Sequence, residues 1–280
     1  MTLRSKTRIV PLLAALNVLL PLSGLSVVQA RASSQFQGAL TPFQVEIEKE
    51  RKRLTSEDVE ERRDAVMRLG AMRHREASRV ATAALTDRSP IVRASAAAAV
   101  LSVPPEEAAA ALIPNLKDKD EFVRQETAYA LGKVRSRAAV GPLIALLEND
   151  KKSGVRGAAA VALGQIGDEA AVGALVQLLP GQDGTAAKRN RKNENGFVMR
   201  AAARSLGQIK SPQAVSALSG TVQNESLPQD VRREAAHALG LIGDPSATAT
   251  LRTVLATPDP YLSRAAHEAL RRIELQKRQQ

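Results

Sequence analysis

The sequence predicts an all-α fold: a right-handed α-solenoid of stacked antiparallel helix pairs, with about six to seven repeats. Three observations predict this fold. A ten-residue pattern recurs at a nearly constant interval, and the apolar residues inside each copy follow the 3.6-residue period of a helix. The chain has only 2% aromatic residues and neither Cys nor Trp, so alanine and leucine must form the core, as in closely packed helices.

The clearest copy is a predicted pair of helices between Val155 and Leu179. Gly164 and Gly167 are expected to loosen and end the first helix, and Asp168 to cap the second. Isolated helices shorter than about 12–15 residues are marginal in water, so the pair needs neighbours. The apolar face of the first helix consists of Val155, Ala159, Ala162, Leu163 and Ile166.

The pattern Val-Arg-x-x-Ala-Ala-x-Ala-Leu-Gly of this copy recurs at 123–132 and 231–240, and less regular copies lie between them and on either side. The last residue of the pattern falls at positions 70, 101, 132, 164, 207, 240 and 271. Successive copies are 31 to 33 residues apart except for one step of 43, which indicates a single insertion. With these motifs, residues 56–275 resemble the HEAT-repeat family, specifically its short phycobilisome-lyase-type repeats. The resemblance implies a solenoid and leaves the function open, because such repeats serve many tasks.

Residues 1–30 have the features of a secretory signal peptide. Arg4, Lys6 and Arg8 form a positively charged start, an apolar run follows, and Val28-Gln29-Ala30 offers small residues for cleavage. The uncharged stretch is long enough to remain as a membrane anchor, an alternative that its two prolines and one glycine disfavour. We therefore expect an exported protein, periplasmic or secreted, with an uncleaved anchor as the alternative.

Residues 31–55 are expected to form a polar tether and a helix that covers the apolar end of the first repeat. Thr41-Pro42 is the predicted start of that helix, with threonine as N-cap and proline at the first helical position. Thr55 and Asp58 have capping-box spacing and predict the start of the first repeat. A capping residue followed by proline recurs at later starts: Ser89-Pro90, Ser211-Pro212, Asp244-Pro245 and Asp259-Pro260.

Aspartates and arginines recur in register with the repeats. Asp87, Asp118 and Asp150 each precede the arginine of the next copy by six residues; these arginines are Arg93, Arg124 and Arg156, and Arg232 has the same position in a later copy. One interpretation is that these aspartates form a row of carboxylates that binds a ligand. The resemblance to HEAT-like proteins implies a structural ladder instead, in which each aspartate meets an arginine of its own or an adjacent repeat.

Residues 181–196 are the insertion. They begin and end with glycine, lack an apolar core, and contain the basic cluster Lys188, Arg189, Arg191 and Lys192. One interpretation is a tolerated spacer, and the other is a contact arm for an acidic partner. In the following repeat Met199 replaces the expected arginine, which indicates an altered junction. At the other end of the repeats, residues 276–280 are expected to be a frayed tail.

Motifs for catalysis or for binding phosphate are absent from the sequence, and we predict no catalytic residue, cofactor or metal ligand. Of the three histidines, His267 is followed by Glu268, which resembles one His-Glu pair of deoxyhypusine hydroxylase, an enzyme that needs several such pairs. Three aromatic residues share a position ten residues before the end of the pattern, which predicts a packing role in the core; they are Phe122, Phe197 and Tyr261.

These observations predict an exported, non-enzymatic scaffold or adaptor that binds another protein through its concave surface. The alternative is an enzyme, or an accessory or assembly subunit of one, resembling the HEAT-type phycobilin lyases. The net charge of +11 favours acidic partners, although three of the basic residues lie in the leader. Because basic and acidic residues alternate along most helices, we expect no nucleic-acid binding, and the sequence leaves the oligomeric state open.

Overall fold

The computed structural model describes residues 40–180 and 195–279. These residues form helices and turns and contain no β-strand, so the predicted all-α class is confirmed. The α-helices are α2 (Pro42–Arg53), α3 (Val59–Ala71), α4 (Arg75–Ala81), α5 (Pro90–Ala99), α6 (Pro105–Leu112), α7 (Glu121–Val134), α8 (Val140–Asn149), α9 (Ser153–Ile166), α10 (Val172–Val176), α11 (Gly196–Ile209), α12 (Val215–Gln223), α13 (Gln229–Ile242), α14 (Thr248–Thr253) and α15 (Pro260–Gln279). Short 3₁₀ helices are η1 (Thr82–Thr86), η2 (Ile113–Lys117), η3 (Arg137–Ala139), η4 (Glu169–Ala171), η5 (Pro212–Ala214) and η6 (Pro245–Ala247).

The chain divides into two compact units, Met1–Val45 and Glu46–Gln280, and each is described by itself. In the first unit α2 begins at Pro42, as the Thr41-Pro42 pair predicts. The Gln44 amide N–H donates to the Thr41 hydroxyl at 3.2 Å, and the Thr41 amide N–H donates to the Gln44 side chain at 3.1 Å. This reciprocal pair is a capping box that satisfies two amides at the start of the helix.

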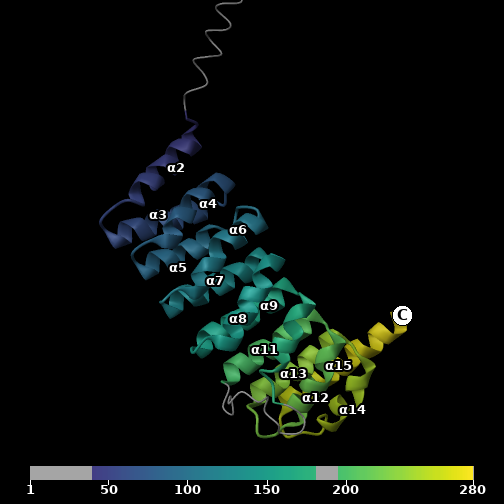
Figure 1. The fold of residues 1–280 in the computed structure, drawn as a ribbon. Coiled ribbons are helices and arrows are strands. Elements are labelled where there is room, and N and C mark those ends of the chain that lie inside the picture. Colours follow the sequence, from purple (N-terminus) through teal and green to yellow (C-terminus); the bar gives the residue numbers. More distant parts are fainter. Residues whose placement is uncertain (1–39, 181–194, 280) are drawn as a thin grey trace, which may run out of the picture. The chain divides into compact units, whose positions relative to one another are not determined.

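The second unit is a stack of helix pairs. Its first helices are α3, α5, α7, α9, α11, α13 and α15, and each contacts the next one, as the coloured ribbon shows for α3, α5, α7 and α9 (Figure 1). Each second helix packs on the first helix of the following pair, as α8 does on α9 and α12 on α13. The antiparallel pairs and their nearest-neighbour stacking confirm the predicted α-solenoid for this unit.

Glycine and alanine bring the first helices close together. A Cβ atom on Gly132, Gly207 or Gly240 would lie 2.7–2.8 Å from the Cα atom of an alanine on the next first helix. Gly164 has the same role: it lies inside α9, and a Cβ atom there would be 2.6 Å from the Ser205 Cβ atom of α11. The prediction that Gly164 loosens its helix is therefore wrong, and Gly167, with φ +77°, alone ends the helix.

Leucine fills the core between these backbones. The largest fully buried side chains are Ile47, Leu69, Leu112, Leu131, Leu143, Leu147, Leu163, Leu175, Leu206, Leu218, Leu239 and Leu251. Phe122, Phe197 and Tyr261 are 45%, 37% and 60% exposed, so the prediction that they pack in the core is wrong. They lie in the first turn of their helices. There the Phe197 ring covers Gly157, and the Tyr261 ring stacks on the Arg233 guanidinium at 4.8 Å.

Two predicted boundaries also differ from the structure. The N-cap of α3 is Asp58, whose carboxylate accepts the Glu60 amide N–H at 2.9 Å, and Thr55 takes no part in the cap. Thr55 instead donates to the Lys52 carbonyl in the turn after α2. At the other end, α15 continues to Gln279 and includes most of the predicted tail, with the ion pair Glu274–Arg278 supporting its last turn.

Candidate protein-binding surface

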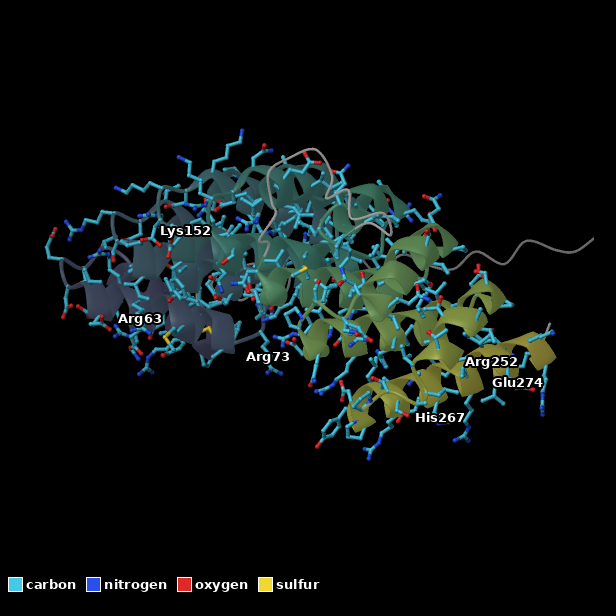
Figure 2. The ribbon with its side chains drawn as sticks, turned by 90° about the horizontal axis from the view of Figure 1, so that it is seen from below. Arg63, Arg73, Lys152, Arg252, His267 and Glu274 are labelled. Atoms are coloured by element: carbon cyan, nitrogen blue, oxygen red, sulfur yellow. The ribbon has the colours of Figure 1, made fainter. Side chains whose placement is uncertain are left out.

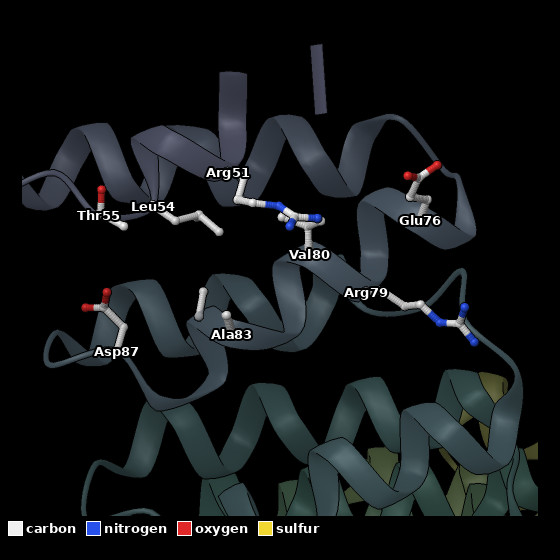
Figure 3. Close-up of a pocket in the computed structure, with 9 residues that line it drawn as sticks. Arg51, Leu54, Thr55, Glu76, Arg79, Val80, Ala83 and Asp87 are labelled. Carbon is white, nitrogen blue, oxygen red and sulfur yellow. The ribbon is translucent and has the colours of Figure 1, made fainter. Parts of the chain in front are cut away.

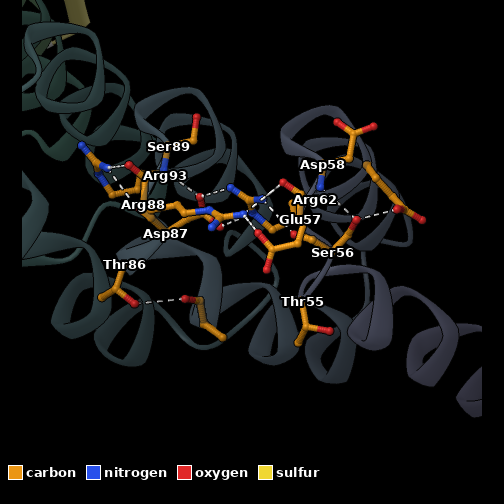
Figure 4. Close-up of polar contacts among 12 residues, drawn as sticks. Thr55, Ser56, Glu57, Asp58, Arg62, Thr86, Asp87, Arg88, Ser89 and Arg93 are labelled. Atoms are coloured by element: carbon orange, nitrogen blue, oxygen red, sulfur yellow. Dashed lines mark hydrogen bonds and ion pairs between the residues drawn. The ribbon is translucent and has the colours of Figure 1, made fainter.

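A row of buried ion pairs joins the first four helix pairs. Arg62 binds Asp87 of the next turn with its Nε atom 2.8 Å from the Oδ2 atom, and Arg93–Asp118 and Arg124–Asp150 repeat the contact at 2.7 Å (Figure 4 shows the first pair). A second guanidinium nitrogen reaches the other carboxylate oxygen in each pair. The side chains are 4–15% exposed. Each of these three aspartates thus forms a bidentate ion pair with the arginine of the preceding repeat.

Each aspartate also holds the turn that follows it. The carboxylate of Asp118 accepts the Asp120 amide N–H at 2.9 Å, while the backbone carbonyl of Asp118 accepts from Arg124 at 2.8 Å. The Arg156 side chain makes the equivalent contact with the Asp150 carbonyl at 2.9 Å. These hydrogen bonds link one ion pair to the next along the stack.

The ionisation of the three aspartates follows from these contacts. Burial acts to raise the pKa of Asp87, Asp118 and Asp150, but hydrogen bonds from arginine and from backbone amides outweigh it and hold each pKa below its ordinary value. Their oxygen atoms are occupied by protein donors. A structural role is the simplest interpretation of this row.

Arg232 does not continue the row. Its Nε atom donates to the Val222 carbonyl at 2.9 Å, and among the described residues no carboxylate pairs with it. The neighbouring Arg233 makes the ion pair instead, with Asp259 at 2.8 Å, and Arg200 likewise pairs with Asp230 at 2.6 Å. The pairing therefore moves by one residue after the insertion, where Met199 occupies the arginine position and is buried.

The sequence reasoning missed Arg62 as the first member of the row. It lies eight residues before Gly70, which is the interval that separates Arg124 from Gly132, so the repeat register contained the signal. The residues Lys188, Arg189, Arg191 and Lys192 of the predicted contact arm lie outside the described residues.

In the described part of the chain, grooves open beside the second helices at two places. One has a volume of about 660 Å³ and lies between η2 and α8, with a floor that includes Leu116, Pro142 and Leu146. The other, about 520 Å³, lies between the end of α2 and α4–η1 and is shown in Figure 3 with Leu54, Val80 and Ala83 facing it. Both volumes are in the range of pockets that bind ligands or side chains.

Between these two grooves the second helices are tied together. The Asn115 side-chain amide of η2 donates to the Leu85 carbonyl of η1 at 2.8 Å, and Asn115 is buried. At the same junction, Glu107 of α6 also binds Arg79 of α4 at 2.7 Å. The open grooves therefore lie two repeats apart, on either side of a closed junction.

The three histidines lie on different elements: His74 before α4, His237 on α13 and His267 on α15. His74 accepts the Glu76 amide N–H as the cap of α4, His237 contacts Arg272, and His267 projects from α15 (Figure 2). No group of three or more His, Cys, Asp or Glu side chains in the described part of the chain is placed to hold a metal ion. The single His267-Glu268 pair does not provide the set of ligands that the resemblance would need. Within residues 40–180 and 195–279, no helix is long and apolar enough to cross a bilayer.

Known protein families match much of the sequence of this chain. The sequence profile for HEAT repeats matches residues 47–131, 109–190 and 225–279, and the profile for the PBS lyase HEAT-like repeat matches residues 198–219. Deoxyhypusine hydroxylase of Gallus gallus is 38% identical over 69 residues, which are 25% of this chain and 23% of the enzyme. The chain thus matches less than a quarter of that relative's length.

One solved structure is similar in fold, and a second matches with a TM-score below 0.5. Escherichia coli YibA has a TM-score of 0.56 at 19% identity, over 90% of this chain and 88% of YibA. The CpcE–CpcF complex of phycocyanin lyase from Nostoc sp. PCC7120 has a TM-score of 0.48 at 22% identity, over 85% of this chain and 96% of that one. Because the HEAT-repeat profile covers more than half of the sequence and the helix pairs stack as described, the chain belongs to the HEAT-repeat family.

Proposed function

We propose that the protein is an exported, non-enzymatic scaffold or adaptor that binds another protein through the concave surface formed by its second helices. The observation that carries the proposal is the contrast between the two helix layers. The first helices pack closely through glycine and alanine, whereas the second helices leave two grooves with apolar floors. Repeat proteins of this kind use an extended surface for binding rather than a deep pocket.

The use of charged groups supports the non-enzymatic part of the proposal. The buried arginines and aspartates of the first four pairs bind each other and the backbone. They are therefore committed to holding the repeats together. General acids, bases and nucleophiles need a free position beside a substrate.

Capture of the partner tests the proposal. The purified mature protein is crosslinked to components of the native envelope fraction, and captured proteins are identified by mass spectrometry. Arginine at the exposed positions Ala83 and Ala145 of the second helices should reduce capture, because the long charged side chain blocks each groove. Arginine at the exposed Ala98 of α5 is the matched control and should leave capture unchanged. If the variants at Ala83 and Ala145 captured as much partner as the control variant at Ala98, a binding surface formed by the second helices would be contradicted.

Export is a separate part of the proposal and rests on residues 1–30. An intact-mass measurement on the native protein should show that the leader has been removed, and cell fractionation should place the product outside the cytoplasm. A full-length mass in the membrane fraction would favour the uncleaved anchor instead.

The match of residues 198–219 to the PBS lyase HEAT-like repeat supports the second candidate, a phycobilin-lyase-like enzyme or an accessory or assembly subunit of one. Under this alternative the mature protein should be cytoplasmic. The purified chain should then promote attachment of a phycobilin to an acceptor protein. Export together with no attachment would remove this candidate.

A further inference from the structure

The groove between η2 and α8 has an apolar floor that is open to solvent. Leu116 and Leu146 form its base and are 5% and 8% exposed, while Ala145 at its rim is exposed. Gly141, which has no side chain, and Ala145, which has only a methyl group, leave room above the leucines. A branched aliphatic side chain fits such a floor by shape and removes apolar surface from water.

The charges around this groove do not balance. Its two carboxylates, Asp118 and Asp150, are already neutralised by Arg93 and Arg124. Lys117 lines the groove, and Lys119 and Lys151 directly follow the two aspartates. None of these three exposed lysines forms an ion pair with the residues that the structure describes.

Neighbouring carboxylates offset part of this positive charge. Glu121 is paired with Lys152 at 2.6 Å, whereas Asp120, which caps the start of α7 by accepting the Phe122 amide N–H at 2.9 Å, keeps its negative charge next to Lys119. Glu148 of α8 does not line the groove and has an interaction of its own. Among the lining residues, Lys117 therefore remains a cation without a counter-charge beside an apolar floor.

The groove at α4–η1 provides an internal comparison. Its arginines are paired, Arg51 with Glu48 at 3.3 Å and Arg79 with Glu107 at 2.7 Å, and Asp87 is paired with Arg62. Its remaining charged side chain is the carboxylate of Glu76, which is exposed. The two grooves are similar in volume, but the unpaired charge among their lining residues is positive in one, at Lys117, and negative in the other, at Glu76.

We propose that the groove between η2 and α8 binds a protein segment in which one aliphatic side chain is flanked by carboxylates. The aliphatic side chain occupies the floor, and the carboxylates lie on the side of Lys117. This inference rests on the proposed protein-binding function and specifies the chemistry of the partner. The apolar floor favours a peptide over a nucleic acid, and charge complementarity at the rim raises the association rate and gives selectivity.

The test measures fluorescence anisotropy with the mature protein and a labelled peptide, Gly-Ser-Glu-Asp-Leu-Asp-Glu-Ser-Gly. Replacing the peptide's leucine by serine, or its four acidic residues by lysine, should each weaken binding by roughly tenfold or more, the size of one buried apolar or charge contact. Added salt should weaken binding of the acidic peptide, because the charged rim is exposed to solvent.

Protein variants locate the site. Lys117→Glu should weaken binding roughly tenfold, and Ala145→Arg should abolish it by filling the groove. Ala83→Arg is the matched substitution in the other groove and should leave peptide binding unchanged. Circular dichroism confirms that each variant is folded, which is expected because all three positions are exposed.

Three results would overturn the inference: equal binding of the lysine peptide, full binding by the Ala145→Arg variant, or equally tight binding of an oligothymidine strand, which would assign the lysines to nucleic acid. Failure of this inference is distinct from failure of the proposed function. If the Ala83→Arg and Ala145→Arg substitutions still reduce capture of a native partner while the acidic peptide does not bind, the protein-binding surface stands and only the stated chemistry is wrong.

Discussion

At the scale of single residues, glycine sets the distance between neighbouring first helices. Gly207 lies where a Cβ atom would be 2.8 Å from the Ala238 Cα atom, and backbone atoms cannot move aside as a flexible side chain can. Alanine on the facing helix adds only one methyl group. The recurring Leu-Gly dipeptide is thus a packing signal within the last turn of the first helices, before the residue that ends the helix.

Gly207→Ala is expected to destabilise the protein by about 1–3 kcal/mol, because the added methyl group overpacks the contact between α11 and α13. Gly173→Ala, at an exposed position in α10 with no atom within 4 Å of the new methyl group, is the control. It should be neutral or stabilise by about 0.5–1 kcal/mol through helix propensity. Urea denaturation followed by circular dichroism measures both. Equal effects of the two substitutions would contradict the close approach.

Asp118→Asn is expected to cost about 3 kcal/mol at neutral pH, since it leaves the largely buried Arg93 without its counter-charge. The pH dependence follows from the lowered pKa of the folded state. The pair's contribution is fully present above the ordinary pKa of aspartate, about 3.9, and is lost as the pH falls through the lower pKa of the folded state.

Unfolding free energies measured between neutral and strongly acidic pH check this expectation. The wild type should lose more stability on acidification than the Asp118→Asn variant. Identical acid dependence of the two proteins would show that this carboxyl group has the same pKa folded and unfolded.

At the scale of elements, the first and second helices of each pair differ in regularity. First helices such as α7 and α9 are continuous over 14 residues, whereas a second helix often begins with a 3₁₀ turn, as η3 does before α8. Side-chain caps start these turns: Ser136, Asp168 and Asp244 each accept the amide N–H two residues later. The two grooves lie where η1 and η2 follow the second helices α4 and α6.

The basic insertion is the other element with a possible role in binding, and it lies outside the described residues. Replacing Lys188, Arg189, Arg191 and Lys192 by glutamine is expected to reduce capture of an acidic partner, since four positive charges are removed. The melting temperature should stay nearly unchanged. Crosslinking capture and thermal denaturation are measured on the same preparation. Undiminished capture would identify the insertion as a spacer.

At the scale of the whole molecule, the described contacts of the Glu46–Gln280 unit join each helix pair to its immediate neighbours. Stability is then close to a sum of repeat and interface contributions, so damage in the middle and damage near an end should have different effects. Leu163 of α9 and Leu251 of α14 are both fully buried and provide the matched comparison.

Leu163→Ala and Leu251→Ala should each cost about 2–5 kcal/mol locally. The central substitution is expected to uncouple the helices on its two sides and broaden the unfolding transition. The substitution near the end should reduce hydrogen-exchange protection mainly in α13–α15. Hydrogen exchange followed by mass spectrometry distinguishes the two patterns. A uniform loss of protection in both variants would contradict nearest-neighbour stability.

The repeat interval, the helical period and the capping residues determined the fold class from the sequence alone. They are local properties of the chain, and they recur in each repeat. The aspartate–arginine register likewise pointed to contacts within or between repeats. Local pattern did not determine which residue each side chain meets. Arg232 and Arg233 differ by one position, and only the stacking of the helices decides which of them reaches a carboxylate.

The surroundings of the aromatic residues and of the grooves could likewise not be predicted from local sequence pattern. Phe122, Phe197 and Tyr261 share a register that fits either a core or a surface position, and their exposure depends on how the neighbouring helices pack. The groove between η2 and α8 brings together residues from 113 to 150, whose distances in space follow from packing. The sequence therefore determined the repeating unit. Tertiary structure decided which surfaces of the units are buried and which stay open, because a side chain is buried only where a neighbouring helix pair covers it.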